Sequence, residues 1–365
     1  MEACMDFLDR IDPDISLKIL TYLEDSSDLL RASSVSRSWR HFVIVNGLWK
    51  QLCLRMFPQL SRVSHVFELN KLSTKELVEA GSSYSKEWES LERDDRAYAL
   101  LARACTSFIV RDCILEAISA SSTDNYPEES IDNTLQPADI VARRASYWLT
   151  RGQSNPAVTE RLTYKLADEF CVITEINIRP FQAYFQSGSP LYLVKAMRFR
   201  MGHPKSPMGV GSDLLSDSYP VSADEKFIWT YTSQEFPVAQ ESCLQKYKLP
   251  EPVLCVGGIL QIELRGRVQR LETGGSLSTR MSYVQVMGRP LSPTFGVEIL
   301  EPSGKFVLKI KNNTLVEFQT QPSIPSADHL QRRRTYFQHI LSIPTILQGN
   351  LVDDINEFEM SDDEE

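Results

Sequence analysis

The chain has 365 residues, of which 42% are hydrophobic and 24% are charged. This composition is typical of a globular protein long enough for two domains with separate cores. The net charge of −9 is concentrated at one end, because 353–365 contains eight acidic residues and no basic one. The rest of the chain is close to neutral, which argues against a general nucleic-acid-binding protein.

No apolar run approaches the roughly 20 residues that a membrane span needs, so we expect no membrane partner. The acids Glu2, Asp6 and Asp9 are unlike a secretory signal. We therefore expect an intracellular protein, located in the cytoplasm, the nucleus or both.

Cysteine and histidine give no sign of a metal site or of catalysis. Seven cysteines are scattered without a Cys-x-x-Cys pair, and most lie between apolar residues, as Cys53 and Cys255 do. We interpret them as reduced cysteines packed in the core. No nucleophile elbow, phosphate-binding loop or zinc-protease motif is visible, so we expect no cofactor, no metal and no enzymatic activity.

The first 57 residues predict a small helical module. Asp12 can cap a helix that begins at Pro13, where the missing N–H of proline costs nothing. Residues 26–28 can cap a second helix, and Asn46-Gly47 can stop a third. Apolar residues at helical spacing mark the first and third helices: Ile15, Ile19, Tyr22 and Leu23, then Val35, Trp39, Phe42 and Val43. So small a core gains stability from docking on a partner.

This module resembles the F-box. The run from Val35 to Arg40, followed by Leu48-Trp49, is the most specific part of the match, and Pro13-Asp14-Ile15 opens it. One position departs from the family, since its usual leucine before the proline is Asp12 here. The resemblance implies docking on a SKP-type adaptor, which links the chain to a cullin–RING ubiquitin ligase whose chemistry lies on other subunits.

The positions that correspond to the family's docking and core residues are Pro13, Ile15, Leu20, Leu23, Leu29, Val35, Trp39, Leu48 and Trp49. Sequence does not separate these two roles. A plain helical domain, with all of these residues in its core, is the alternative.

Residues 58–118 are expected to form a helical linker. A Ser-rich stretch with a short helix near 74–80 precedes a longer helix from about Asp94 to Ala120. The predicted buried face of that helix includes Leu115 and Ile118.

Residues 119–320 predict an antiparallel β-sandwich. Between Leu260 and Arg265 apolar and polar residues alternate, which is typical of a half-buried strand. Many short strands without intervening helices favour a sandwich over a βαβ sheet, so the fold class is α+β and multidomain. The predicted strands are 161–166, 171–179, 192–200, 227–232, 253–256, 259–268 and 283–287, with two more at 296–300 and 305–311.

The start of this region, with Asn125-Tyr126-Pro127, Ile131-Asp132 and Trp148, resembles a discoidin or galactose-binding-like jelly roll. Loops at one end of such sandwiches commonly hold ligands. An F-box followed by this sandwich is similar to a group of plant F-box proteins, and another F-box class with such a sandwich recognises sugar chains on glycoproteins. The candidate substrate-binding residues are Tyr126, Tyr184, Phe185 and His203, the last in a predicted loop, whereas Trp148 is expected in the core.

The function predicted from these resemblances is a substrate-recognition subunit of an SCF-type ligase. Its substrate is an unknown protein, glycosylated or not. Two alternatives stay open: a scaffold that delivers nothing for destruction, and a glycan- or peptide-binding module that uses the sandwich loops. A helix is expected in 321–350, followed by a disordered acidic tail at 351–365. Phe358 and Met360 in that tail could instead dock on a basic partner.

Overall fold

The structure, a computed structural model, describes residues 6–69, 83–141, 143–205, 226–270, 275–300 and 303–311. Some predictions lie outside these residues: the short helix near 74–80, the helix of 321–350 and the acidic tail of 351–365.

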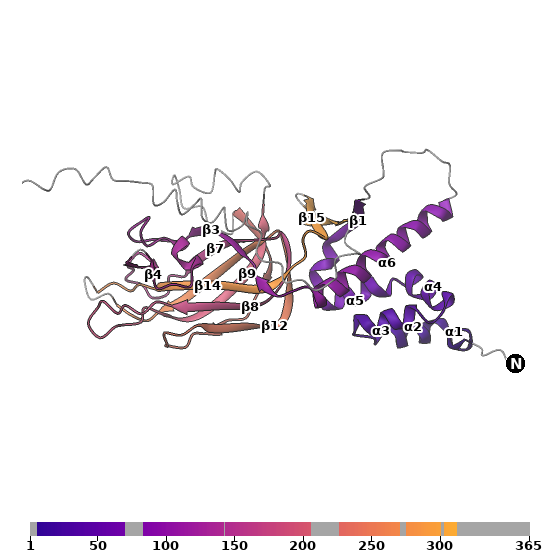
Figure 1. Cartoon of the computed structure of the whole chain (residues 1–365), viewed down its shortest axis with the longest axis horizontal. Helices are drawn as coiled ribbons and strands as arrows, with labels where there is room; N and C mark the ends of the chain where they lie inside the picture. The colour runs from indigo at the N-terminus through magenta and orange to yellow at the C-terminus, as the bar shows by residue number, and fades with distance from the viewer. Residues whose placement is uncertain are drawn as a thin grey trace, which may run out of the picture. The chain divides into compact units, whose positions relative to one another are not determined.

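The predicted helical module is present, with local capping that the sequence explains. An Asp12 carboxylate oxygen accepts a hydrogen bond from the backbone N–H of Asp14 at 2.8 Å, and Pro13 is the first helical residue. The second helix is capped by Asp25, one residue before the predicted 26–28. Gly47 has φ +57°, a conformation that favours glycine. The helices are α1 (Phe7–Arg10), α2 (Pro13–Thr21), α3 (Ser26–Ser33), α4 (Arg37–Val45) and α5 (Leu48–Met56), followed by the 3-10 helix η1 (Pro58–Arg62) (Figure 1).

The prediction of a long helix from Asp94 to Ala120 is wrong at both ends. Helix α6 covers Ser83–Ser107, and the strands β2 (Arg111–Asp112) and β3 (Ile114–Ala120) follow it. The Asp112 carboxylate accepts from the backbone N–H groups of Ile114 and Val286, which turns the chain into the sheet. Because β1 (Val63–Leu69) precedes α6, the expected helical linker contains strands.

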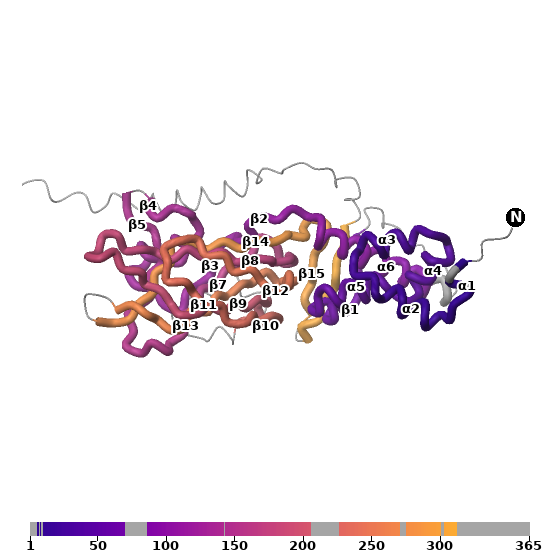
Figure 2. The backbone as a smooth tube through the Cα atoms, turned by 90° about the horizontal axis from the view of Figure 1, so that it is seen from below, coloured from indigo at the N-terminus to yellow at the C-terminus, as the bar shows by residue number. Residues whose placement is uncertain are grey.

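The sandwich consists of two antiparallel sheets. One has the order β10-β9-β13-β7-β3, with β11 beside β9, and the other has the order β12-β8-β14-β2, with β6 beside β14 (Figure 2). The strands are β6 (Trp148–Leu149), β7 (Glu160–Leu166), β8 (Phe170–Pro180), β9 (Val194–Pro204), β10 (Phe227–Thr232), β11 (Phe236–Pro237), β12 (Gln245–Val256), β13 (Ile259–Arg267) and β14 (Arg280–Pro290). The 3-10 helix η2 (Ile131–Leu135) and the hairpin of β4 (Ile140–Val141) and β5 (Arg144–Ala145) complete this region.

The seven predicted strands between 161 and 287 all overlap observed ones, so the predicted α+β class with an antiparallel sandwich is confirmed. The inner faces of the two sheets enclose one core, which includes Leu162, Ile176, Phe199 and Ile262. Trp148 is fully buried in it, as expected.

A third sheet joins the segment that follows the helical module to the C-terminal end of the described residues. Its order is β1-β16-β15, where β15 is Phe295–Leu300 and β16 is Lys305–Lys311, and β1 runs parallel to β16. A second core contains residues of the helices, such as Leu52 of α5 and Leu101 of α6, together with Phe306 of β16 and Phe170 of β8. The helices and the sandwich therefore share buried side chains through this small sheet.

Candidate functional site

Helix α2 and its C-cap residue, Tyr22, present an apolar stripe to solvent. Ile15, Ile19 and Tyr22 are 54%, 43% and 72% exposed, whereas Ser16 and Leu20 on the other side are buried. A surface helix normally turns its apolar face to the core. These three residues, called the α2 stripe below, are thus a surface suited to a partner.

The nine predicted F-box positions differ in burial. Four are buried in the module, two are half-buried, and three are exposed. The buried positions are Leu20, Leu29, Leu48 and Trp49. The half-buried ones are Leu23 and Trp39, and the exposed ones are Pro13, Ile15 and Val35. Ile19, Tyr22 and Leu30 are further exposed apolar residues outside the predicted set. Helical spacing already grouped Ile19 and Tyr22 with Ile15.

Polar contacts fix the ends of this surface. An Arg55 guanidinium N–H donates to the backbone carbonyl of Leu23 at 2.8 Å, and another donates to that of Thr21, which satisfies carbonyls at the end of α2. The indole N–H of Trp39 donates to the Asp6 carboxylate at 2.6 Å. Helices α2 and α4 are therefore held in place by side-chain hydrogen bonds as well as by packing.

Five aromatic rings gather where β8 ends and β14 begins. Tyr147 stacks on Phe181 with centroids 4.2 Å apart, and Phe181, Tyr184 and Phe185 lie within 6.2 Å of one another. Tyr192 is buried in the same group. Tyr184 and Phe185 are 50% and 52% exposed. This aromatic cluster brings together two of the four predicted substrate-binding residues.

Arg280 lies beneath the aromatic cluster. Its guanidinium carbon is 4.3 Å from the ring centroid of Tyr192, 5.2 Å from that of Tyr147 and 5.4 Å from that of Phe185, so cation–π contacts stabilise the charge. Arg280 is only 4% exposed. Its Nε and Nη1 atoms are buried without a hydrogen-bond partner, which is costly for a cation.

Tyr126 lies in a loop that reaches the same cluster. It is 76% exposed, and its neighbour Asn125 donates to a Glu129 carboxylate oxygen at 2.9 Å. The other Glu129 oxygen accepts from the Tyr147 hydroxyl at 2.6 Å. Burial and this hydrogen bond raise the pKa of Tyr147, so its hydroxyl stays protonated and acts as a donor.

The structure does not bring His203 to the aromatic cluster. His203 is on β9, not in a loop, and is 1% exposed, so the predicted loop position is wrong. The cluster lies near Val194, at the opposite end of this strand, and an antiparallel strand rises about 3.4 Å per residue. Gly257 packs against the start of the His203 side chain, since a Cβ added at Gly257 would come within 2.1 Å of the His203 Cβ.

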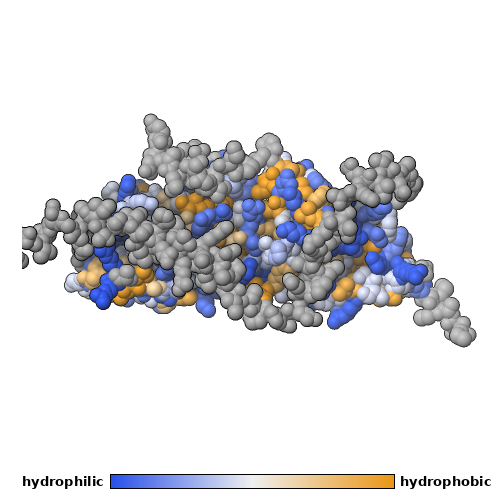
Figure 3. All heavy atoms as spheres, turned by 45° about the horizontal axis from the view of Figure 1, so that its top comes forward, coloured by the Kyte–Doolittle hydropathy of each residue, from blue (hydrophilic) through white to orange (hydrophobic). Residues whose placement is uncertain are grey.

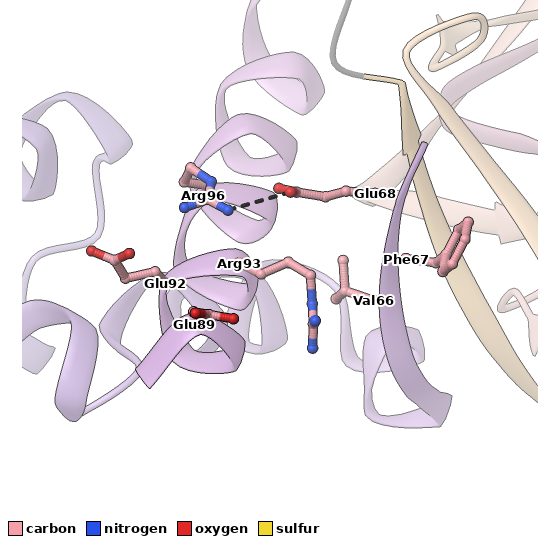
Figure 4. A pocket seen from close by; sticks show the side chains of 7 residues that line it. All are labelled: Val66, Phe67, Glu68, Glu89, Glu92, Arg93 and Arg96. Carbon is pink, nitrogen blue, oxygen red and sulfur yellow. Dashed lines mark hydrogen bonds and ion pairs between the residues drawn. The ribbon is translucent and has the colours of Figure 1, made fainter. Parts of the chain in front are cut away.

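A groove of about 340 Å³ separates β1 from α6. Val66 points into it, Phe67 points away from α6, and the Arg96 guanidinium reaches the Glu68 carboxylate at 3.3 Å (Figure 4). Glu89, Glu92 and Arg93 complete its lining. Both signs of charge line the groove, so its electrostatics favour no one class of ligand.

Among the described residues, no group of three or more His, Cys, Asp and Glu side chains could hold a metal ion. Six free cysteines are described, and all except Cys243 are buried. Burial raises the pKa of Cys105 and of Cys113 to about 12, so these thiols stay protonated and unreactive. In the same part of the chain, no helix is long and apolar enough to cross a membrane.

Apolar residues on the face shown in Figure 3 form separate patches among hydrophilic ones, as on most protein surfaces. An exposed apolar residue by itself therefore does not mark a site. The α2 stripe and the aromatic cluster stand out because their residues are ordered along one helix or stacked on a buried cation.

Comparisons with known proteins match the helical module to a known family. The model of the F-box-like family matches residues 13–55, the segment that carries the α2 stripe. An F-box protein of Arabidopsis thaliana, At4g00755, is 50% identical over 309 residues, which cover 84% of this chain and 82% of the relative. The chain therefore belongs to the F-box protein family.

A second relative is similar over a short segment only. A probable E3 ubiquitin ligase complex SCF subunit, sconB of Arthroderma otae, is 43% identical over 49 residues, or 13% of this chain and 7% of the relative. Among solved structures, the family 32 carbohydrate-binding module of C. perfringens NanJ in complex with galactose is 11% identical, with a TM-score of 0.31. The match covers 49% of this chain and 99% of that one.

Proposed function

We propose that this chain is a substrate receptor of an SCF-type cullin–RING ubiquitin ligase, acting in the cytoplasm, the nucleus or both. It binds a SKP-type adaptor through the F-box and a substrate protein through the sandwich. The observation that supports this most is the α2 stripe, an apolar helix face exposed inside the segment that matches the F-box-like family. The name of the sconB relative, an SCF subunit, points in the same direction.

Co-migration of the full chain with a purified SKP-type adaptor on size exclusion tests the adaptor step. Ile15→Asp/Ile19→Asp places two charges on the stripe, and Pro13→Ala/Ile15→Asp perturbs the start of α2. Because these side chains are exposed, the variants should fold, and melting curves check this. Each lost apolar anchor costs about 1–2 kcal/mol of binding, so a double change should weaken the complex by roughly 30-fold or more.

Ile140→Asp is a matched control, since Ile140 is 57% exposed but lies on β4. It should leave the complex intact. If the wild-type chain is folded and forms no complex, or if Ile140→Asp weakens the complex as much as the stripe variants do, the adaptor role is refuted.

The aromatic cluster is the proposed substrate surface. Tyr184 and Phe185 offer exposed rings, and Arg280 offers unpaired N–H donors below them. In cells without the native chain, proteins that accumulate and return to normal levels with the wild type are candidate substrates. When it is expressed in these cells, the Tyr184→Ala/Phe185→Ala variant should bind the adaptor but should not restore the turnover of the candidate substrates. If no protein changes its lifetime when the chain is lost, the scaffold alternative takes its place.

Exposed aromatic rings at one end of a sandwich also favour a glycan on the substrate, because flat rings pack well against sugar faces. A glycan array with the full chain, beside the Phe185→Ala variant, tests this second reading. Binding that the variant loses supports a glycosylated substrate. An array without any binding by the wild-type chain leaves a peptide as the recognised group.

A further inference from the structure

The outer face of one sandwich sheet holds four arginines around one glutamate. Glu263 of β13 has a side chain only 3% exposed. Arg198 contacts it at 2.6 Å, Arg265 at 3.1 Å, Arg200 at 3.3 Å and Arg161 at 3.8 Å. We call these four residues the arginine face. The alternation along β13 predicts that Glu263 faces solvent, but the surrounding guanidinium groups bury it.

Among the described residues, positive charge exceeds negative charge on this face. Besides Glu263, the acidic residue in contact there is Glu235, which pairs with Arg265. In the described part of the chain, four arginines thus meet two glutamates on this face, although the net charge of the whole chain is −9. The neighbouring pair of Lys165 and Glu116, at 3.4 Å, adds no net charge.

The surplus is more than the burial of Glu263 requires. Arg198 contacts one oxygen of Glu263, Oε2, through both its Nε and its Nη2 at 2.7 and 2.6 Å, and Arg200 reaches the other oxygen, Oε1, at 3.3 Å, so two arginines already satisfy both carboxylate oxygens. Each further guanidinium brings like charges together, which is unfavourable. Arg161 makes only the 3.8 Å ion pair, and its Nε is buried without a hydrogen-bond partner.

The donors are partly accessible. The side chains of Arg161, Arg265 and Arg198 are 35%, 33% and 28% exposed. A guanidinium carries five N–H donors, and the two carboxylates cannot accept from all of them. Trp229 of β10 supports the guanidinium of Arg200 at 4.6 Å from its ring centroid. The face thus combines a fixed arrangement with unused hydrogen-bonding capacity.

We propose that the arginine face binds an acidic peptide segment of a partner protein, with carboxylate or phosphate groups on alternate residues. The register supports an extended segment rather than a single anion. Glu263 is paired with Arg161 on β7 and with Arg198 on β9, and neighbouring strands lie about 4.8 Å apart. The backbone positions of Arg161 and Arg198 therefore lie about 10 Å apart on either side of Glu263. The arginine face thus extends across three strands, far enough to meet two like-facing side chains of an extended peptide.

The test is fluorescence anisotropy with the full chain and three labelled peptides of about 12 residues. One alternates Glu with Ser, the second carries phosphoserine at alternate positions, and the third replaces the acids with Gln. We expect the two anionic peptides to bind and the Gln peptide not to bind. Affinity should fall at least several-fold between 50 and 300 mM salt, because surface charges are screened.

Arg161→Gln and Arg265→Gln should each weaken peptide binding about 3- to 10-fold, because each removes one guanidinium from the face. Both variants should keep the fold, because Glu263 keeps its contact with Arg198. Arg151→Gln is the matched control at an exposed arginine outside the face. A chain ending at residue 350 is measured in parallel, so that the acids of 353–365 cannot compete for the peptide.

Preference for the phosphorylated peptide assigns the site to phosphoserine, and equal binding assigns it to negative charge in general; both support the proposal. No binding by the wild type at millimolar peptide, or equal loss with Arg151→Gln, overturns it. Because co-migration with the adaptor is measured on the same variants, failure here is distinguishable from failure of the proposed ligase role.

Discussion

Removing one partner of the buried ion pair between Glu160 and Arg267 should destabilise the sandwich strongly. The side chains are 3% and 1% exposed. The other Glu160 oxygen accepts from the Ser122 hydroxyl at 2.9 Å. Arg267 also donates to the backbone carbonyl of Leu277 at 2.9 Å and to that of Arg151 at 3.1 Å. The pair therefore ties the end of β13 to the segments that precede β14 and follow β6.

Glu160→Gln keeps the size of the side chain and removes its charge, which leaves the Arg267 cation buried without a counter-ion. Breaking one partner of a buried pair costs about 3–5 kcal/mol. Replacing both, in Glu160→Leu/Arg267→Met, should stay within about 2 kcal/mol of the wild type, because no charge is then stranded. The two partners should therefore be strongly non-additive.

Urea unfolding at pH 7.5, followed by circular dichroism and by tryptophan fluorescence, measures these free energies where the two probes coincide. Asp28→Asn is the control, because the pair of Asp28 with Arg31 is 50% and 78% exposed and should contribute under about 1 kcal/mol. If Glu160→Gln costs no more than Asp28→Asn, the reasoning from burial is refuted.

Two further predictions concern stability. Burial raises the pKa of Asp95 to about 6, so the folded chain binds more protons than the unfolded chain between about pH 4 and 6, and the stability from this carboxyl falls as pH rises through that window. Asp95→Asn should raise Tm at pH 7.5 and change it little at pH 4; an equal shift at both values would contradict this. Gly257→Ala should lower Tm far more than Gly188→Ala. Both glycines have positive φ, but of the two only Gly257 would place its new Cβ against another residue, His203. Equal losses of Tm would show that backbone strain alone decides.

The F-box could be predicted from sequence because its signals are local. Asp12 and Pro13 start α2 through capping and a fixed φ, and neither depends on distant residues. Whether each apolar residue is buried or exposed depends instead on how the helices pack together. Ile15 and Leu20 are both apolar residues of α2, and only the packing of the other helices decides that Leu20 is buried and Ile15 is not.

The two longest strands that the sequence analysis missed, β1 and β3, depend on distant partners. β1 pairs with β16, and β3 pairs with β7 and follows α6 closely enough for its apolar residues to continue the helical spacing. β-propensity is weak compared with such pairing. Two residues of the aromatic cluster, Tyr184 and Phe185, could be predicted because they are adjacent in sequence. Arg280 could not, because only the fold brings it to them.

The two surfaces differ in chemistry, which bears on how many partners this chain has. The α2 stripe is apolar and gains from excluding water, so its contacts change little with salt. The arginine face is cationic, and its contacts weaken as ionic strength rises. An adaptor complex that survives high salt while binding of the acidic peptide is lost would show that the two surfaces work independently. A receptor can then keep its place in a ligase while a second partner exchanges on the sandwich.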